Sequence, residues 1–498
     1  PASTQLSDEL ATAVPFLALP DSNTAQIGDN VFSFRVRSDS LPLFAASPMD
    51  HHYVFGFCFF RQRRDPDAPR GFFQKSVVVL TDLPFVGLFK RLAHTLGPMF
   101  FDAGPAALEA AFNNINDWPA PRPGLTLDLP LMGQLIPFRV PWTGTPSPPC
   151  PQRSPLSPSL PGLPGVFQEV GLFAVFRGLT HSLWRLWELA ITGKPVLVLG
   201  TDPQLVGDVV MGIVSLISPL CYGGDYRPYF SLYDTDFKDI ADRHDASKGA
   251  SMPALLLGAT NPLFARSLAY FPNALWIGPR ARPPPSVRVA CGQCTHPAFD
   301  PPTRSPRWPR PAAPPRACAR CHCPRGTLAS RRPSTPSSFV TREQALVPPD
   351  VSVLNQLLQL RPEDELEPQL RFSDGRAVAG SSDGEVPAVV INNAVLRQHF
   401  RKLTQAFLKP FNLYFFAGQA TASELRGLGP YDDLAAGLVP KFNEAAFLDH
   451  VKATGLPRLL RKAKWKKLYT GFIQSPHFWP WFRAREQATA RRLHKLAR

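Results

Sequence analysis

The stretch PVLVLGTDPQLVGDVVMGIVSLI (residues 195–217) joins a short apolar run, Pro195 to Leu199, to a longer one, Gln204 to Ile217. The first run has the length of a strand and the second the length of a helix, so the stretch predicts a strand followed by a helix. The same alternation continues on both sides. In chain order, the predicted segments are helix Leu172 to Ile191, strand Pro195 to Leu199, helix Gln204 to Ile217, strand Pro228 to Tyr233, a helix around Phe237, strand Ala254 to Leu257, helix Pro262 to Phe271 and strand Ala274 to Ile277. Strands separated by helices predict a parallel, doubly wound α/β sheet.

A different pattern lies on each side of this region. From Asp29 to Pro141 the sequence favours a mixed sheet with helices, because runs of aromatic and β-branched residues precede two amphipathic segments. The strands expected there are Phe32 to Val36, His52 to Gln62 and Gln74 to Thr81, and the helices are Phe85 to Leu96 and Ala106 to Trp118. After Phe339 no strand pattern survives. The helices expected in that part are Val351 to Leu360, Asn393 to Leu408, Phe442 to Lys452 and Pro476 to Leu496.

Proline clusters suggest the domain boundaries. The chain has 57 prolines, about twice the usual share, and the Pro/Ser-rich stretch Thr143 to Gly165 suits neither a helix nor a sheet. We therefore predict an α/β domain (1–142), a linker (143–165), a doubly wound α/β domain (166–278), an insertion (279–338) and an α-helical domain (339–498). Because the chain starts at Pro1 without an initiating Met, we expect the first domain to be N-terminally incomplete.

The net charge of +15 is concentrated in two segments. Pro279 to Ser338 holds eleven arginines against one acid, and Gly455 to Arg498 holds twelve lysines or arginines against one acid, which leaves the remainder at −6. No basic field therefore covers the folded body.

The most apolar stretch, Val209 to Leu220, is shorter than the roughly 18 residues that a membrane-spanning helix needs. The few scattered cysteines outside the insertion indicate a reducing, cytosolic compartment.

The insertion carries two cysteine pairs with the spacing of zinc ligands. These are CGQC, Cys291 to Cys294, and CARCHC, Cys318 to Cys323. The surrounding residues lack lysine, are rich in Pro and Arg, and show no apolar period that would pack around a metal. We therefore predict that residues 279–338 are a disordered or wrongly joined insertion without a metal site.

The motifs of common enzymes are absent. The sequence has no G-x-S-x-G elbow, no Walker A loop, no G-x-G-x-x-G turn and no H-E-x-x-H helix. We therefore predict no bond-making catalytic site, no cofactor and no bound metal.

Long motifs nevertheless identify a family. The chain closely resembles the DENN domain-containing protein 6 family at FGFCFFRQRRDPDAPRGFFQKSVVVLTDLP (55–84), and the likeness continues through later motifs. These are NDWPAPRPGLTLDLPLMG (116–133), LWELAITGKPVLVL (186–199), ISPLCYGGDYRPYFSLYDTDFK (217–238), LLGATNPLFARSL (256–268) and YTGFIQSPHFWPWF (469–482). The motifs are collinear and span nearly the whole chain. Two departures are an opening that enters the first domain after its first strand and the insertion, which replaces a shorter, Lys-rich connector.

The resemblance implies an upstream longin-like domain, a central α/β DENN domain and a downstream helical domain. It also implies a guanine-nucleotide exchange factor for a Rab-family small GTPase, located in the cytoplasm and peripherally on endosomes, with the recycling endosome favoured. Such a protein needs no acid, base or nucleophile, because weakening nucleotide binding requires only tighter binding to the empty GTPase. An adaptor that binds the loaded GTPase without exchange is the alternative. The sequence neither separates the two nor identifies the Rab.

The resemblance places the GTPase in a groove between the longin-like and DENN domains. Thr260 and Asn261 follow a predicted strand, and ligands of open α/β sheets bind beyond strand carboxyl ends. The resemblance alone suggests Asp225, Tyr226 and Arg227, which precede the strand predicted from Pro228 to Tyr233. The sheet residues expected to face the same groove are Arg61, Gln62, Gln74 and Lys75. Three alternatives stay open: Asn261 caps a helix, Tyr226 packs in the core, and the sheet residues form a solvated hairpin.

The basic C-terminal segment suggests a second partner. We predict that its cations contact an anionic membrane peripherally, since each Lys or Arg near such a surface contributes about 1 kcal/mol. They are Arg458, Arg461, Lys462, Lys464, Lys466 and Lys467. Nucleic acid is not expected, because no recognition fold accompanies the charge. The aromatic residues Phe478, Trp479, Trp481 and Phe482 that follow are predicted to lie in the helical core.

Overall fold

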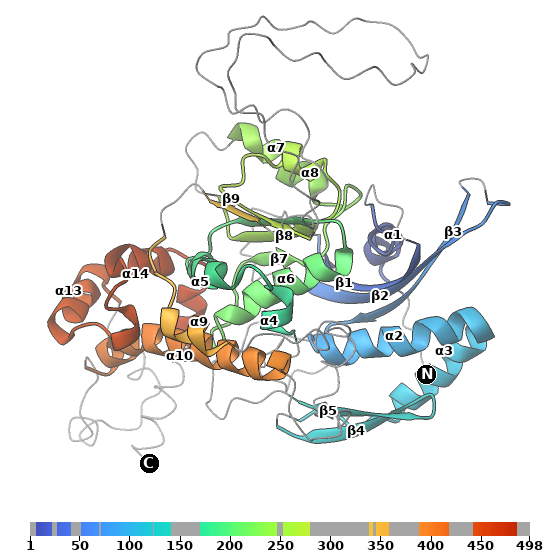
Figure 1. The fold of residues 1–498 in the computed structure, drawn as a ribbon, viewed down its shortest axis with the longest axis horizontal. Coiled ribbons are helices and arrows are strands. Elements are labelled where there is room, and N and C mark those ends of the chain that lie inside the picture. The colour runs from blue at the N-terminus through green and yellow to red at the C-terminus, as the bar shows by residue number, and fades with distance from the viewer. Residues whose placement is uncertain are drawn as a thin grey trace, which may run out of the picture.

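The computed structural model describes residues 6–21, 27–40, 51–68, 71–122, 124–140, 170–246, 252–278, 338–341, 345–357, 388–417 and 442–485. Three parts follow one another along the chain: an antiparallel sheet with helices, a mostly parallel sheet with helices, and a C-terminal group of helices (Figure 1). The predicted class, mixed α/β with a helical C-terminal region, is confirmed.

The N-terminal sheet consists of β1 (Gly28–Arg37), β2 (Tyr53–Arg64) and β3 (Phe72–Thr81), in the order β1-β2-β3. Both pairings are antiparallel, so the expectation of a mixed sheet was wrong. Phe32, Phe34 and Val36 share one face, as their alternation predicted, and pack with helix α1 (Asp8–Leu17). The opposite face is covered by α2 (Val86–Ala103), followed by α3 (Pro105–Asn116) and the hairpin of β4 (Thr126–Leu131) and β5 (Gln134–Arg139).

The central sheet has the order β10-β9-β6-β8-β7. Its strands are β6 (Val196–Gly200), β7 (Asp225–Arg227), β8 (Leu255–Ala259), β9 (Asn273–Ile277) and β10 (Ser338–Thr341), and only the β9–β10 pairing is antiparallel. Val196 and Val198 pack toward α5 (Leu183–Ile191) and α6 (Pro203–Leu216), whereas Leu197 and Leu199 pack toward α7 (Phe237–Ala246) and α8 (Phe264–Ser267). Alternate residues thus meet helices on both faces, which confirms the doubly wound sheet.

Two predicted elements of this region were wrong, and one strand was missed. The strand expected at Pro228 to Tyr233 is Asp225–Arg227 instead, because proline has no N–H to donate to a ladder and the chain turns after it. The single helix expected from Leu172 to Ile191 is interrupted by Gly178, whose φ of 78° ends a helix. It forms α4 (Leu172–Val175), a short 3₁₀ helix (Thr180–Ser182) and α5. The strand β10 was missed because four residues beside a Pro/Arg-rich stretch carry no visible period.

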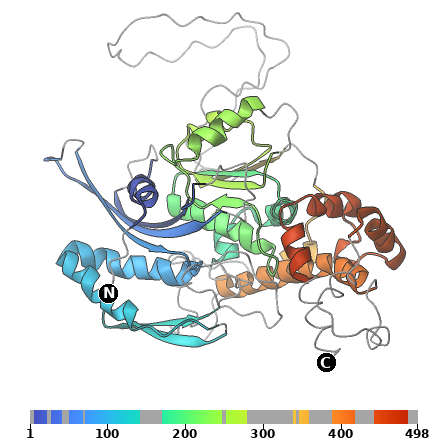
Figure 2. The ribbon, with the colours of Figure 1, turned by 180° about the vertical axis from the view of Figure 1, so that it is seen from behind.

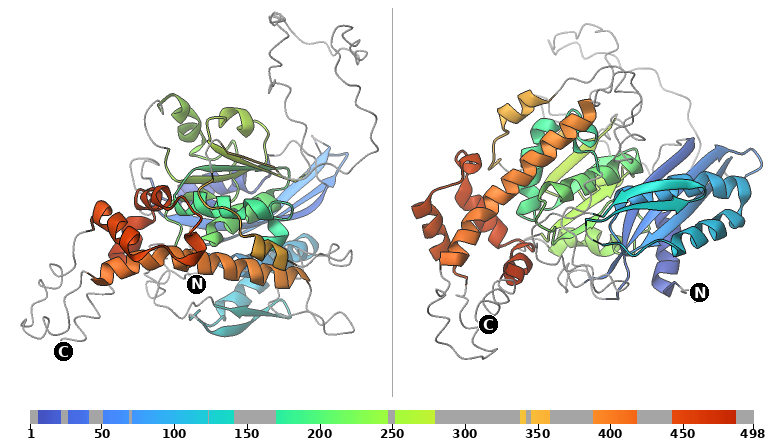
Figure 3. Two further views of the ribbon diagram at one scale, coloured as in Figure 1. Left: turned by 60° about the vertical axis from the view of Figure 1, so that its left-hand side comes forward. Right: turned by 90° about the horizontal axis from the view of Figure 1, so that it is seen from below.

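The C-terminal part is helical and packs against the central part. It comprises α9 (Val351–Gln356), α10 (Ala388–Ala417), α13 (Glu444–Thr454), a 3₁₀ helix η3 (Arg458–Leu460), α14 (Trp465–Ile473) and a helical stretch at 478–485. Figure 3 shows α10 running beneath the helices of the central part. In Figures 1 and 2 the group of α13 and α14 lies at the opposite end of the molecule from α3.

Some predictions fall outside the described residues. The linker 143–165 and both cysteine pairs of the insertion belong to this group. The predicted boundary between residues 338 and 339 cuts β10, which pairs with β9 of the central sheet.

Within the described ranges, no helix is long and apolar enough to span a bilayer. The same ranges contain no group of three His, Cys, Asp or Glu side chains placed to hold a metal ion.

Candidate functional site at the junction of the two sheets

The N-terminal and central sheets meet along β1 and β7. Aromatic packing holds the two sheets together at this contact. The ring centres of Phe32 of β1 and of Tyr229, which follows β7, lie 5.1 Å apart in an edge-on arrangement. Arg35 of β1 donates to the carbonyl oxygen of Tyr226 at 3.2 Å, and its guanidinium carbon lies 3.5 Å from the ring centre of Tyr53 and 3.9 Å from that of Tyr226. A cation held between two aromatic rings joins the two sheets.

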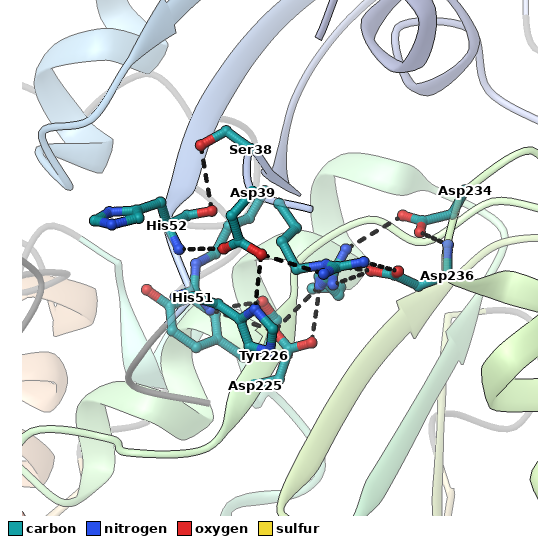
Figure 4. A network of polar contacts seen from close by, with 11 residues as sticks. Ser38, Asp39, His51, His52, Asp225, Tyr226, Asp234 and Asp236 are labelled. Atoms are coloured by element: carbon teal, nitrogen blue, oxygen red, sulfur yellow. Dashed lines mark hydrogen bonds and ion pairs between the residues drawn. The ribbon is translucent and has the colours of Figure 1, made fainter. Parts of the chain in front are cut away.

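A buried ion network extends from this contact (Figure 4). Arg227, with a fully buried side chain, donates to both carboxylate oxygens of Asp225 at 3.1 Å and to Asp236 at 2.6 Å, and it lies 3.5 Å from Asp234. Arg37 of β1 donates to Asp236 at 2.7 Å. The arginines of β1 therefore neutralise carboxylates of the central part: Arg37 pairs with Asp236 and Arg35 lies 3.5 Å from Asp225.

The network continues into the segment that precedes β2. Asp39 accepts from Arg37 at 3.2 Å and from the backbone N–H of His52 at 2.6 Å, and it lies 2.9 Å from Nδ1 of His51 (Figure 4). His51 is 7% exposed, so this histidine belongs to the junction. Removing one partner of such a buried network typically costs about 3–5 kcal/mol, because the remaining charges are left uncompensated.

The two central carboxylates respond differently to burial. Burial alone would raise the pKa of Asp225, but the positive charges of Arg227 and Arg35 outweigh it and hold that pKa below its usual value. Burial raises the pKa of Asp234 to about 6 although Arg227 opposes the shift. Asp225 is thus the firmly ionised anchor of the network.

Asp225, Tyr226 and Arg227 were predicted to face a partner from the end of the strand expected at Pro228 to Tyr233. They form β7 itself, and they are 5%, 1% and 0% exposed. In this conformation they connect the two sheets and do not line a surface. For Tyr226 the packing alternative describes its position.

Arg61, Gln62, Gln74 and Lys75 lie together at the other end of the N-terminal sheet. Arg61 pairs with Asp29 at 2.6 Å, Gln74 donates to Gln62 at 2.7 Å across the ladder, and Lys75 lies over a phenylalanine ring of α2. Arg61 and Gln62 are mostly buried, whereas Gln74 and Lys75 are exposed. Asp29, the partner of Arg61, lies eight residues before Arg37 on β1, so about 27 Å of extended strand separates this group from the ion network.

Thr260 and Asn261 lie at a third position, where helix α1 meets the central part. Asp21, four residues after α1, accepts a hydrogen bond from Thr260 at 3.3 Å, from the Tyr229 hydroxyl at 3.0 Å and from the backbone N–H of Leu232 at 3.0 Å. Asn261 accepts from the N–H of Leu263 at 3.0 Å and so stabilises the turn before α8. The N-cap of α8 is Leu263 and has no side-chain cap, so the alternative that Asn261 caps a helix was wrong. Sequence reasoning missed Asp21, because no local motif marks a residue whose partners lie more than 200 positions away.

Exposed apolar side chains lie close in sequence to Asp21 and to its hydrogen-bond partners Leu232 and Thr260. Phe16 and Tyr233 stack with ring centres 5.4 Å apart, although they are 49% and 61% exposed. Leu19, two residues before Asp21, is 42% exposed, and Leu263, three residues after Thr260, is 47% exposed. We call Phe16, Leu19, Tyr233 and Leu263 the junction surface. Exposed apolar side chains grouped in this way are typical of a protein interaction site.

The structure is a mixed α/β body with a C-terminal helical region, an architecture that is consistent with a DENN protein. No protein-family model matches the chain. It is 30% identical over 530 residues to protein DENND6B of Mus musculus, with 100% of this chain and 77% of that protein covered. It is 28% identical over 522 residues to protein DENND6A of Gallus gallus, with coverage of 100% and 77%. It is also 34% identical over 328 residues to the DENND6 homolog of Dictyostelium discoideum, with coverage of 54% and 45%. The chain belongs to the DENN domain-containing protein 6 family.

Proposed function

We propose that this protein is a guanine-nucleotide exchange factor that promotes GDP release from a Rab-family small GTPase, and that the GTPase binds on the junction surface. Membership of the DENN domain-containing protein 6 family supports a Rab-family GTPase as the partner. The junction surface is the observation that supports the location of the binding site, because it presents apolar side chains from both α/β parts.

The proposed mechanism is differential binding. A factor that binds the nucleotide-free GTPase about 10⁴-fold more tightly than the loaded form must weaken nucleotide binding by the same factor, and this coupling corresponds to about 5.5 kcal/mol. The buried network around Arg227 and the hydrogen bonds to Asp21 hold the two parts of the surface in place. Little binding energy is then spent on ordering the exchange factor.

The decisive measurement is the release of fluorescent GDP from a panel of Rab proteins. We expect faster release from at least one endosomal Rab. Replacing both Phe16 and Tyr233 with alanine should reduce the exchange rate at limiting concentration roughly 30-fold or more, because a central aromatic side chain of an interface commonly contributes 2 kcal/mol or more.

Phe112 provides a matched control, since it is a 55% exposed phenylalanine on α3, away from the junction. Phe112→Ala should leave exchange unchanged. Equal losses in both variants would contradict the proposed location. Unchanged release from every Rab, together with binding only to the GTP-loaded form, would instead identify an adaptor.

Gln74 and Lys75 offer a second position for GTPase contact, because both are exposed. The same assay applied to Gln74→Ala and Lys75→Ala decides whether the hairpin end contributes to GTPase binding.

As part of the proposal, we place the protein in the cytoplasm and peripherally on endosomes, the recycling endosome in particular, on the basis of its family. Imaging of the tagged protein with endosomal markers tests this location.

A further inference from the structure

A basic surface covers the C-terminal helical part. From residue 451 to residue 485 the sequence contains no Asp or Glu. The six cations of η3, the turn after it and the start of α14 all have exposed side chains; they are Arg458, Arg461, Lys462, Lys464, Lys466 and Lys467. We call these six residues the basic surface.

A packed aromatic core lies beneath α14, which carries part of the basic surface. The other side of α14 buries Leu468, Tyr469 and Phe472. The ring of Tyr469 stacks on Phe407 of α10 with centres 4.7 Å apart and an interplanar angle of 14°, and its hydroxyl donates to the Phe407 carbonyl oxygen at 3.2 Å. Lys466 and Lys467 therefore project from a helix that is packed on α10, which lowers the ordering entropy lost when they bind a partner.

The positions of the lysines are electrostatically unfavourable for the isolated protein. Lys464 is the N-cap of α14, Lys466 and Lys467 lie in its first turn, and that turn contains no acidic residue. The N-terminus of a helix carries a partial positive charge, so cations there repel it. An anionic partner would relieve this repulsion.

Apolar side chains accompany the cations. Leu459 is 40% exposed, and Trp465 is partly exposed with the Lys466 ammonium 5.7 Å from its ring centre. Tryptophan at the headgroup level and an aliphatic side chain beside lysines are typical of surfaces that bind bilayers. A groove for single-stranded nucleic acid would instead combine such cations with several aromatic residues on which successive bases stack.

We propose that the basic surface binds the headgroups of an anionic lipid bilayer and orients the protein on a membrane. The surface lies at the end of the molecule opposite α3 (Figure 1). This inference does not depend on the proposed exchange activity, because vesicle binding is measured without a GTPase.

The test is co-sedimentation of the full chain with vesicles of phosphatidylcholine, with and without phosphatidylserine, at low and at physiological ionic strength. We expect binding only to vesicles with phosphatidylserine and weaker binding at higher salt. The triple variant Arg461→Gln, Lys462→Gln, Lys466→Gln should bind on the order of 100-fold more weakly, since each Lys or Arg near an anionic surface strengthens binding roughly five-fold.

A matched triple variant removes the same charge elsewhere. Arg63→Gln, Arg122→Gln and Arg139→Gln alter exposed arginines of the N-terminal part and should leave vesicle binding within about two-fold of the unaltered chain. Circular dichroism melting verifies that both variants fold. Three results would overturn the proposal: binding that ignores lipid charge and salt, equal losses in the two variants, or binding of an oligonucleotide or free inositol phosphate without vesicle binding.

Discussion

Among single residues, burial separates polar side chains that organise the protein from those that can meet a partner. Arg227 is fully buried among three carboxylates, whereas Tyr233, six residues later, is 61% exposed. His477 is another organising residue, only 2% exposed. Its Nδ1 accepts the N–H of Gly223 at 2.7 Å, so its Nε2 carries the proton and donates to the Ala190 carbonyl oxygen at 2.8 Å. This neutral histidine connects the C-terminal part to two segments of the central part.

The buried state of His477 predicts a pH dependence of stability. Burial lowers its pKa from 6.5 to about 4. Between these values the unfolded chain binds a proton that the folded chain does not, so stability is complete above about pH 6.5 and falls as the pH drops toward 4, by about 3 kcal/mol in total.

Asp234 has the opposite effect on the pH dependence of stability. Its pKa of about 6 is raised in the folded chain, so the folded chain binds a proton at a higher pH than the unfolded chain and gains stability as the pH falls. The measurement is therefore a comparison of urea unfolding free energies for the protein and for His477→Gln across this pH range. The variant should be less stable at pH 7 but lose less stability on acidification. Parallel curves for the two proteins would contradict the assignment.

Between elements, hydrogen bonds from tryptophans fix how the central and C-terminal parts pack. Trp184 and Trp187 of α5 are at most 1% exposed, and their indole N–H groups donate to Nε2 of His399 at 3.1 Å and to the hydroxyl of Thr404 at 2.9 Å, both on α10. Two donors on one helix thus select one position of the other, since a shift along α10 would leave both unpaired.

This contact predicts a specific loss of stability. Thr404→Val keeps the shape of the side chain but leaves the Trp187 N–H without an acceptor, so we expect the free energy of unfolding to fall by about 1–3 kcal/mol. The control is Thr454→Val, the same change at an exposed position of α13, which should alter stability by less than about 0.5 kcal/mol. Equal effects in urea unfolding would show that α5 and α10 are not held in this way.

For the whole molecule, the strands β9 and β10 show where the insertion enters the fold. Trp276 and Ser338 are register partners in an antiparallel pair, so the chain leaves and returns at neighbouring positions. A short glycine-containing turn can therefore replace residues 279–337. Ser338 must be kept, because it begins β10.

We expect this shortened chain to keep its melting temperature and its activity in nucleotide release. A metal chelator should have no effect on the unshortened protein. Calorimetry and a zinc-release assay test both statements. A lower melting temperature after shortening, with stoichiometric zinc release from the original chain, would show that the cysteine pairs form a structural site.

The sequence by itself determined the elements with a clear local period. The alternation of Phe32, Phe34 and Val36 gave one apolar strand face, and the run from Pro195 to Ile217 gave the strand and helix at the centre of the doubly wound sheet, because periodicity alone sets which face of an element is apolar. Buried Phe478, Trp481 and Phe482 also agree with the predicted helical core. The collinear motifs identified the family.

Only the tertiary structure decided which side chains are exposed. It buried Asp225, Tyr226 and Arg227, left Trp479 48% exposed beside its buried neighbours, and brought Asp21 to Thr260 across 239 positions. The physical reason is that exposure and hydrogen bonding depend on the elements that pack from elsewhere in the chain. A local sequence pattern predicts which face of a helix or strand is apolar, but it does not predict which other element packs against that face.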